Sequence, residues 1–475
     1  MQAPALKRTP LEAWIAGKIA ASPSLPLRPE ELAAYQLQKL CETIEYASHC
    51  SPFYREKLSK FTPAELKSIS DLARFPFTSC EELRDENPRF LAVSQDEISR
   101  VVTLSSSGTT GRPKRVFFTA DDQQLAVDFF QCGTKNLAAP GDPVMVLLPW
   151  ETPGSIGDLL AEGISRSGAV PVRHGMISSL GGALERLTAE KIDSVIGLPV
   201  QVFALARYAQ AMGASPRLRS VALVSDHVPA CIVAELKRLW HCEVFQHYGA
   251  TEMGLGGGVD CQAHAGYHLR EADLYFEIVD PESGKPVLAG EPGEVVFTTL
   301  TRRGMPLIRY RTGDLSRMLT APCACGSLLR RMEPLKSRDS VRLGSPKGPG
   351  SHLTMAMLDE ALFPVPGVIE FEATLRRGQG LSTLTIAAQS VHSGPGADPV
   401  SGPANPVEQA LRKALGSVDA IDCEHRAGRL DLDIGVRYGV DALQPRAEKR
   451  MITEAGLNGE QGNLPYPPRQ DSARG

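Results

Sequence analysis

The sequence predicts an α/β fold: a large N-terminal body of parallel-sheet βαβ layers, an antiparallel β subdomain from about residue 272, and a small, mobile α+β C-terminal domain. Two observations lead to this prediction. Between residues 144 and 240, short apolar runs alternate with amphipathic stretches of helical length, which is typical of βαβ units. After residue 272, strand-like segments follow one another without helices between them, as in an antiparallel sheet.

The expected elements follow from apolar periodicity. The first helix is expected over residues 30–48, where apolar residues such as Leu37, Leu40 and Ile44 recur on one face. The strands of the parallel sheet are expected at 144–148, 169–172, 194–198 and 221–224. Helices are expected at 180–191 and 228–240, and antiparallel strands at 275–279 and 294–297.

The length of 475 residues is enough for at least two domains with separate cores. The expected parts are a large domain at 1–336, a small C-terminal domain at 337–456 and a disordered tail at 457–475. A second change of composition, at 344–350, combines glycine and proline in a way that excludes regular structure. In the small domain, a flexible loop at 392–406 is expected between a strand (384–386) and a helix (407–415).

Composition excludes several classes of protein. Lysine and arginine number 51 against 55 aspartates and glutamates, so the broad basic surface of a nucleic-acid binder is absent. No apolar run reaches the roughly 18 residues that cross a bilayer, and the N-terminus lacks a signal-type apolar core. Ten cysteines are too few for a disulfide scaffold in a chain of this length. We therefore expect a cytoplasmic protein with reduced thiols and no membrane insertion.

Residues 105–114 read Ser-Ser-Ser-Gly-Thr-Thr-Gly-Arg-Pro-Lys and follow an apolar run at 101–104. Glycines and small hydroxyl residues let N–H and O–H groups approach phosphate oxygens, and Lys114 adds positive charge. The spacing differs from that of the P-loop motif. A flexible linker is the alternative that composition alone favours, but the order of residues within the segment argues against it.

This segment resembles the nucleotide-binding loop of the adenylate-forming superfamily, which includes acyl-CoA synthetases, adenylation domains and luciferases. Further motifs of that superfamily follow in its order: Tyr-Gly-Ala-Thr-Glu at 248–252, Tyr-Arg-Thr-Gly-Asp at 310–314, and Lys449. Each motif alone is more often a turn or a solvated charge, whereas their ordered occurrence favours a functional site. Residues 37–58 and a Cys-x-Cys-Gly after the third motif resemble the phenylacetate-CoA ligase branch.

The resemblance implies an AMP-forming acid–thiol ligase. Such an enzyme uses ATP to convert a carboxylic acid into acyl-AMP, releases pyrophosphate, and transfers the acyl group to the thiol of CoA. The implied phosphate-binding residues are Ser106, Ser107, Gly108, Thr109, Thr110, Gly111 and Lys114.

The resemblance also implies roles at the other motifs. Thr251 would bind the α-phosphate and Glu252 would hold Mg²⁺, a hard ion that prefers oxygen ligands. Asp314 would accept hydrogen bonds from the ribose, Tyr248 would lie against the adenine, and Lys449 would stabilise charge as the anhydride forms. The remaining implied nucleotide-binding positions are Gly249, Ala250 and Arg338.

Two departures from the family pattern keep alternatives open. Ser337 stands where the hinge region has glycine, and Glu448 stands where a glycine commonly precedes the lysine. The C-terminal domain is implied to rotate between the two half-reactions, so these changes bear on CoA transfer. The alternatives are an adenylating enzyme with another acceptor and an inactive nucleotide-binding homologue. A homodimer is a further expectation.

Cysteine and histidine residues cluster in the sequence around the third motif. Cys323 and Cys325 share a predicted turn, and Cys261 and His268 lie upstream, with His264 as the rival histidine. Three cysteines and one histidine are a common tetrahedral set for structural Zn²⁺. The Cys-x-Cys spacing is tighter than usual, so incidental thiols are the alternative. Because the resemblance includes these positions, we expect a structural zinc site.

The acid pocket is expected beyond the carboxyl ends of the parallel strands, where ligands bind in such sheets. Trp150, His174 and His247 fall there and are the predicted pocket residues. A tryptophan at such a place is more often ordinary packing. The resemblance to the phenylacetate-CoA ligase branch makes aryl acids, such as phenylacetate or benzoate, the expected substrates.

Overall fold

A computed structural model describes residues 6–19, 27–104, 113–335, 340–343, 350–378, 380–391, 406–439 and 450–455. Several predicted features lie outside these ranges: the loop residues Ser106, Ser107, Gly108, Thr109, Thr110 and Gly111, the hinge residues Ser337 and Arg338, Glu448, Lys449, most of the segments 344–350 and 392–406, and the tail. The chain forms two compact units, and the described residues up to 335 belong to the first and those from 340 to the second.

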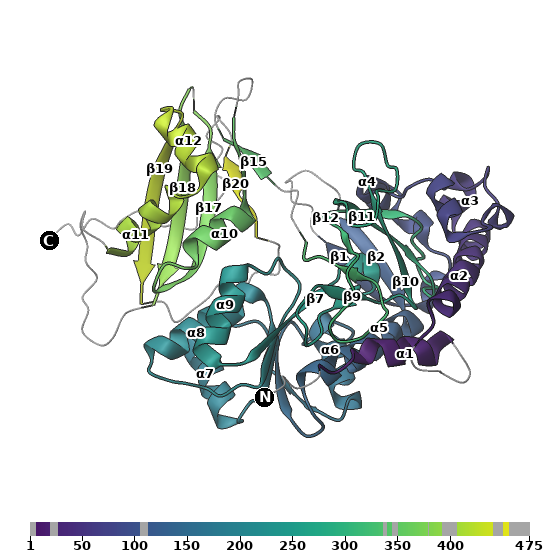
Figure 1. Cartoon of the computed structure of the whole chain (residues 1–475), viewed down its shortest axis with the longest axis horizontal. Helices are drawn as coiled ribbons and strands as arrows, with labels where there is room; N and C mark the ends of the chain where they lie inside the picture. Colours follow the sequence, from purple (N-terminus) through teal and green to yellow (C-terminus); the bar gives the residue numbers. More distant parts are fainter. Residues whose placement is uncertain are drawn as a thin grey trace. The chain divides into compact units, whose positions relative to one another are not determined.

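The first unit is organised by a nine-stranded sheet of order β13-β14-β9-β8-β7-β6-β5-β3-β4 (Figure 1). Its parallel part consists of β4 (Val170–Arg173), β3 (Pro143–Leu147), β5 (Ser194–Gly197), β6 (Ser220–Leu223) and β7 (Glu243–Tyr248). β5 and β6 are buried throughout, because helices cover both faces of the sheet. The predicted parallel sheet is confirmed.

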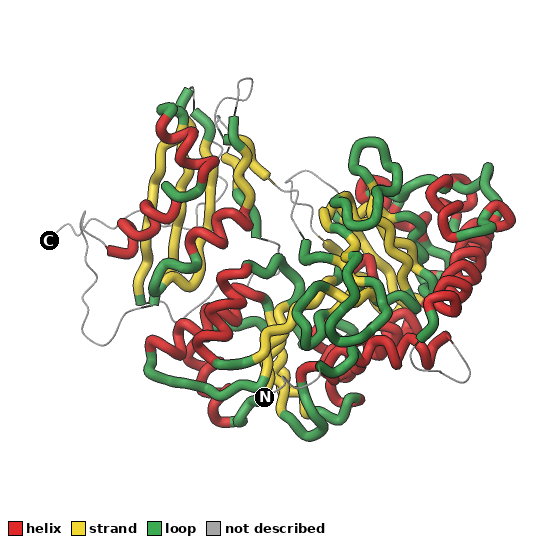
Figure 2. The backbone as a smooth tube through the Cα atoms, viewed as in Figure 1, coloured by secondary structure: helices red, strands yellow, loops and turns green. Residues whose placement is uncertain are grey.

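The helices on this sheet are α5 (Ala120–Leu137), α6 (Ile156–Arg166), α7 (Leu180–Ala189), α8 (Pro199–Ala211) and α9 (Ala230–Trp240). α5 and α6 lie on one side of the strands, and α7, α8 and α9 lie on the other (Figures 1 and 2). α5 begins at Thr119, whose hydroxyl accepts a hydrogen bond from the Asp122 amide, while the Asp122 carboxylate accepts one from the Thr119 amide. This N-terminal cap fixes where α5 begins, and α5 carries Phe129 and Phe130.

Four short antiparallel strands extend the sheet beyond β7. They are β8 (Gly258–Val259), β9 (Tyr267–Leu269), β14 (Arg331–Met332) and β13 (Met318–Leu319). These strands are not among the predicted elements, because strands of two or three residues show no periodicity. They bring the segment around residue 325 beside β9.

The predicted antiparallel subdomain is a separate three-stranded sheet of β10 (Leu274–Val279), β11 (Gly293–Thr299) and β12 (Tyr310–Ser316). A hairpin of β1 (Ile98–Leu104) and β2 (Lys114–Thr119) contributes to the same hydrophobic core, together with α2 (Pro29–Cys50). The other N-terminal helices are α1 (Pro10–Ile19), α3 (Pro52–Lys57) and α4 (Cys80–Asp85). Short 3₁₀ turns occur at Pro63–Glu65, Ile69–Arg74, Asn87–Phe90, Gln95–Glu97 and Thr251–Met253.

The second unit is built on a four-stranded sheet of order β19-β18-β17-β20. Its elements are β17 (Val368–Arg376), β18 (Ser382–Ser390), β19 (Leu430–Tyr438), β20 (Thr453–Ala455), α10 (Met355–Leu362), α11 (Pro406–Leu415), α12 (Asp419–Arg426) and a hairpin of β15 (Ser340–Arg342) and β16 (His352–Thr354). Arg450, the residue after Lys449, forms an ion pair with Asp359 of α10 and lies 4.6 Å from the ring centre of Phe371. The chain is thus anchored directly after the predicted catalytic lysine.

The observed layers match the predicted α/β class with its added antiparallel sheet and its small α+β unit. Among the described residues, no helix combines the length and the apolar character needed to span a membrane.

Candidate active site

A hollow opens at the carboxyl end of β7, the place where parallel sheets bind ligands. It brings together motifs that lie 66 residues apart: the hydroxyl of Tyr248 donates a hydrogen bond to Asp314 Oδ2 at 3.2 Å. The ring of Tyr267 stacks on Tyr248 with 6.0 Å between centroids. The hollow is lined by Ser225, Asp226, His227, Val228, Gln246, His247, Tyr248, Gly249, Tyr267, Asp314, Pro334 and Leu335.

Burial, with the Asp314 carboxylate next in effect, raises the pKa of Tyr248 well above its usual value. Tyr248 therefore stays protonated and can act as a donor. Its hydrogen bond occupies one oxygen of Asp314 and orients the carboxylate at the edge of the hollow. Further acceptor positions on a carboxylate suit hydroxyl groups of a sugar.

The Thr-Gly-Asp motif on β12 has an irregular backbone that explains its glycine. Gly313 has a φ of +79°, in the left-handed region that side chains disfavour. Its amide donates to Glu294 Oε1 at 3.1 Å, and the Asp314 amide donates to the Thr312 hydroxyl at 3.0 Å. The strand pairing with β11 shifts register there, so Asp314 departs from the regular alternation of the strand.

A second group of motif residues meets where β2 approaches the turn after β7. The Lys114 ammonium forms an ion pair with Glu252 Oε1, and the Tyr310 hydroxyl donates to the same oxygen at 3.1 Å. Lys114 also lies 3.3 Å from the Tyr310 hydroxyl and 3.7 Å from the Cys80 sulfur. Burial opposes the charge of Lys114, but the Glu252 carboxylate outweighs it and holds the pKa of Lys114 above its ordinary value.

The turn that carries Glu252 is held by a buried guanidinium. Arg302 donates to the main-chain oxygen of Glu252 at 2.8 Å and to that of Phe117 on β2 at 2.9 Å. Thr251 starts the 3₁₀ turn, which ends at Gly254 with a φ of +75°. The sequence alone assigns no site role to Arg302, Tyr310 or Cys80, because their roles come from contacts between distant segments.

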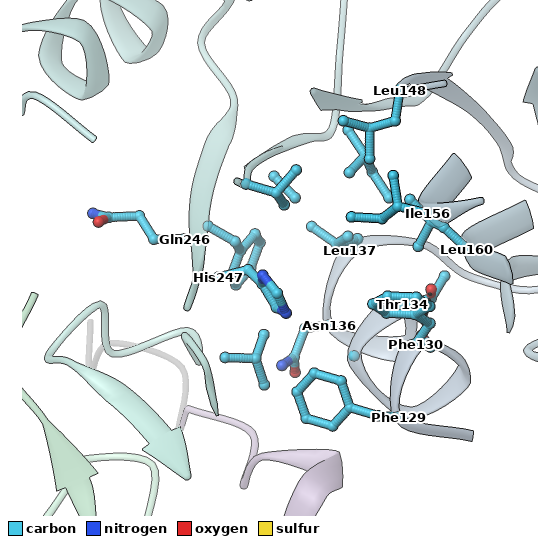
Figure 3. A pocket seen from close by; sticks show the side chains of 16 residues that line it. Phe129, Phe130, Thr134, Asn136, Leu137, Leu148, Ile156, Leu160, Gln246 and His247 are labelled. Atoms are coloured by element: carbon cyan, nitrogen blue, oxygen red, sulfur yellow. Dashed lines mark hydrogen bonds between the residues drawn. The ribbon is translucent and has the colours of Figure 1, made fainter. Parts of the chain in front are cut away.

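An apolar cavity lies between the parallel strands and the helices α5 and α6 (Figure 3). Its described lining residues carry no formal charge. They are Phe129, Phe130, Gly133, Thr134, Asn136, Leu137, Leu148, Ile156, Leu160, Ile196, Ala222, Val224, Phe245, Gln246, His247 and Val259. His247 and Gln246 also line the hollow that contains Tyr248 and Asp314, so the two spaces meet at the end of β7.

The three predicted pocket residues do not line the same space in the structure. His247 lines both spaces, whereas Trp150 and His174 are not among the described residues that line either. Trp150 instead packs near Gly175 and faces the guanidinium of Arg173, 5.9 Å from its ring centre. The cavity lies on the α5 and α6 side of the strands, away from Trp150 and His174.

The predicted metal ligands converge. Ligand atoms of Cys261, His268, Cys323 and Cys325 all lie within 4.8 Å of one another, and all four residues are buried. Cys261 Sγ is 3.6 Å from Cys323 Sγ, and Cys325 Sγ is 3.5 Å from His268 Nε2. A tetrahedral zinc with bonds of about 2.0–2.3 Å separates its ligand atoms by about 3.5–3.8 Å, so this donor set fits the ion.

His264 does not join the cluster. Its two ring nitrogens lie 2.8 Å from Asp260 Oδ2 and 2.8 Å from Glu243 Oε2. The cluster is held by the antiparallel extension of the large sheet, with His268 on β9 and the two close cysteines between β13 and β14. It therefore belongs to the nine-stranded sheet and not to the β10–β12 sheet.

The family model and the relatives that match this chain identify an adenylate-forming enzyme. A family model for AMP-binding enzymes matches residues 36–300. The phenylacetate-coenzyme A ligase of Thermus thermophilus is 29% identical over 449 residues, covering 89% of this chain and 95% of the relative. That of Aromatoleum evansii is 31% identical, covering 66% of this chain and 72% of the relative.

The chain belongs to the AMP-binding enzyme family, in its phenylacetate-CoA ligase-like branch, and its class is that of AMP-forming acid–thiol ligases. The predicted family and class are confirmed. A solved 2-hydroxyisobutyryl-CoA ligase in its postadenylation state, in complex with R3-HIB-AMP, matches with a TM-score of 0.71 at 20% identity and covers 91% of each chain. That likeness confirms the fold.

Proposed function

We propose that this chain uses ATP to activate an aromatic, phenylacetate-like carboxylic acid as acyl-AMP and then transfers the acyl group to CoA. The observation that carries the proposal is the meeting of two spaces at His247, one polar and one apolar. The polar space holds the motif residues Tyr248 and Asp314, as a nucleotide site requires. The apolar space suits the hydrocarbon body of an acid, whose carboxylate would point toward the nucleotide.

In the nucleotide site, Asp314 would bind the ribose hydroxyls and Tyr248 would lie against the adenine. Lys114, with the loop at 106–111, would bind the β- and γ-phosphates, and Thr251 would bind the α-phosphate. The buried Glu252 carboxylate fits Mg²⁺, which takes one or two protein carboxylates together with phosphate oxygens. The further positions proposed for the nucleotide are Gly249, Ala250 and Arg338.

The reaction would proceed in two displacements. A carboxylate oxygen attacks the α-phosphorus, and the bond to pyrophosphate breaks. The thiol of CoA then loses its proton and attacks the acyl carbon, and AMP leaves. In the first step Lys449 would stabilise the charge that develops between the carboxylate and the α-phosphate.

The acid is proposed to be aromatic because Phe129 and Phe130 form one wall of an uncharged cavity (Figure 3). Aromatic rings pack against one another in offset or edge-on arrangements that favour flat ligands. The relatives named above are phenylacetate-CoA ligases, which agrees with such a substrate.

We also propose that Cys261, His268, Cys323 and Cys325 bind a structural Zn²⁺. The proposal is supported by the buried, closely spaced ligand atoms. The ion would join β9 to the β13–β14 segment, where the sheet has only two- and three-residue strands. A homodimer, a cytoplasmic location and the domain limits 1–336 and 337–456 stay predictions from the sequence.

The test is pyrophosphate exchange into ATP across a panel of carboxylic acids, followed by thioester formation with CoA. We expect exchange with aryl acids and a CoA thioester as the product. In a Lys449→Ala variant, exchange should fall at least about 100-fold, while Lys413→Ala, on the exposed side of α11, should behave as wild type.

Other outcomes separate the alternatives. Acyl-AMP that hydroxylamine traps readily, with no thioester when CoA is added, would mean that the acceptor is not CoA. Nucleotide binding without exchange for any acid would mean an inactive homologue.

A further inference from the structure

The imidazole of His247 is the polar group of the acid cavity whose hydrogen-bonding capacity is unused. Both ring nitrogens are buried, and neither has a hydrogen-bond partner among the described residues. The other polar residues of the lining are engaged. The Thr134 hydroxyl donates to the Phe130 oxygen at 2.8 Å, Asn136 Nδ2 donates to the Asp260 oxygen at 3.1 Å, and Gln246 Oε1 accepts from Tyr267 at 3.4 Å.

The position of the ring is fixed by its neighbours. Its centroid lies 5.8 Å from that of Phe129 and 6.4 Å from that of Phe130. Two glycines also approach the ring: a Cβ at Gly249 would lie 2.9 Å from the His247 Cε1, and one at Gly256 would lie 3.3 Å from Nε2. The glycines leave room for the ring and the aromatic side chains confine it. Figure 3 shows its nitrogens on the side of Asn136 and Phe129.

The imidazole is uncharged in this setting. Burial, and then the nearby Arg270 guanidinium, lower the pKa of His247 to about 4. A neutral imidazole offers one N–H donor and one nitrogen acceptor. It therefore suits an uncharged partner such as a hydroxyl, which both donates and accepts, better than it suits a second carboxylate or an ammonium group.

An acid whose body is purely hydrocarbon would form no hydrogen bond with the His247 imidazole. When such an acid fills the cavity it displaces water, and the imidazole nitrogens then remain buried without a partner, which costs free energy. An acid that places a hydrogen-bonding substituent beside the imidazole avoids that cost. Sites built to hydrogen-bond a substrate hydroxyl reject analogues without it far more strongly than apolar pockets distinguish similar hydrocarbons.

We propose that His247 reads an uncharged hydrogen-bonding substituent on the acid, so that the substrate class is aryl acids that carry a hydroxyl or a comparable neutral group. This inference rests on the proposed function, because it specifies the acid that the same site activates. His247 is assigned as a specificity-determining residue that contacts the substituent. Because His247 stands where the two spaces meet, the substituent would lie near the carboxylate end of the acid, with the carboxylate itself in the polar space.

The test compares kcat/KM for pyrophosphate exchange with phenylacetate and with 2-, 3- and 4-hydroxyphenylacetate, in wild type, His247→Leu and His247→Gln. We expect wild type to prefer one hydroxylated isomer over phenylacetate by about 10-fold or more. His247→Leu should lower kcat/KM for the preferred hydroxylated isomer by about 10-fold more than for phenylacetate, so that the preference is lost. His247→Gln, which retains a donor and an acceptor, should keep part of the preference.

Two results would overturn the inference while leaving the proposed function in place. One is a wild type that activates phenylacetate as well as every hydroxylated isomer. The other is a His247→Leu variant that loses activity equally on all four acids, which would assign His247 to the carboxylate or the nucleotide. If His247→Leu does not fold, the wild-type panel and His247→Gln still decide the question. Exchange with none of a broad panel of acids would overturn the proposed function itself, and this inference with it.

Discussion

Lys114, the first residue of β2, and Glu252, in the turn that follows β7, form a largely buried ion pair although they lie 138 residues apart. The pair joins the end of the predicted phosphate loop to the predicted magnesium ligand. On binding of ATP and Mg²⁺, each charge would gain a partner of opposite sign in the ligand. The pair thus holds both side chains close to their proposed binding positions before the nucleotide arrives.

The first prediction concerns this ion pair. Lys114→Met and Glu252→Gln each leave one buried charge without its partner, so each should lower the free energy of unfolding by about 3 kcal/mol. The double variant Lys114→Met/Glu252→Gln removes both charges and should recover most of that loss, yet remain inactive in pyrophosphate exchange. Urea unfolding measures the stabilities, and Lys135→Met, an exposed lysine on α5, is the control. A double variant no more stable than the singles would contradict the coupling.

A second prediction distinguishes the contributions of Tyr248 and Asp314 to ATP binding. Tyr248→Phe keeps the ring that stacks on Tyr267 and removes only the hydrogen bond that orients Asp314. We expect it to raise the KM for ATP by about 3- to 10-fold, as for loss of one neutral donor. Asp314→Asn removes the charged acceptor and should raise the KM for ATP by about 10- to 100-fold. Steady-state kinetics at saturating acid measure both, and equal effects would show that Asp314 acts only through Tyr248.

Metal content gives a third prediction. Purified protein should contain about one zinc per chain, and Cys323→Ser should lower both the zinc content and the melting temperature. His264→Asn is the matched control, because His264 is engaged by Asp260 and Glu243 outside the ligand cluster. Elemental analysis and thermal unfolding provide the measurements. Full zinc content in Cys323→Ser, or its loss in His264→Asn, would refute the assigned ligand set.

Two helical glycines offer a fourth prediction about the acid cavity. A Cβ added at Gly133 on α5, or at Gly17 on α1, would meet no atom within 4 Å. Both Gly133→Ala and Gly17→Ala should therefore stabilise the protein, by about 0.5–1 kcal/mol, because alanine loses less backbone entropy in a helix. Only Gly133 lines the cavity, so only Gly133→Ala should lower kcat/KM for the bulkiest acids. The same acid profile in both variants would mean that the acid binds elsewhere.

The fifth prediction is a pH dependence of stability. The pKa of His247 is lowered to about 4 in the folded protein, below the ordinary 6.5, so the folded state resists protonation. Its contribution to stability is complete above pH 6.5 and is lost as the pH falls toward 4. Relative to wild type, His247→Gln should therefore gain about 2 kcal/mol of stability between pH 7.5 and pH 4.5. Unfolding curves at the two pH values test this, and a constant difference would show that the pKa of His247 is the same in the folded and unfolded states.

Much of the molecule follows from local sequence patterns. The buried strands predicted at 194–198 and 221–224 lie within one residue of the observed strands at each end, because apolar runs between amphipathic helices leave few other arrangements. The motifs at 248–252 and 310–314 are enough to predict the family. Gly313 follows the same logic, since its left-handed backbone is a local requirement that only glycine meets easily.

The remaining features depend on contacts between segments that are distant in the chain. The positions of His264 and His268 in the sequence do not decide which of them is the zinc ligand. Only the pairing of β9 with β14 brings His268 to the cysteines. Likewise Trp150 and His247 both lie at strand ends, but the packing of α5 and α6 decides that His247 faces the cavity. Residue patterns encode periodicity and motif order, whereas side-chain partners such as Lys114 and Glu252 are set by how the sheets and helices pack together.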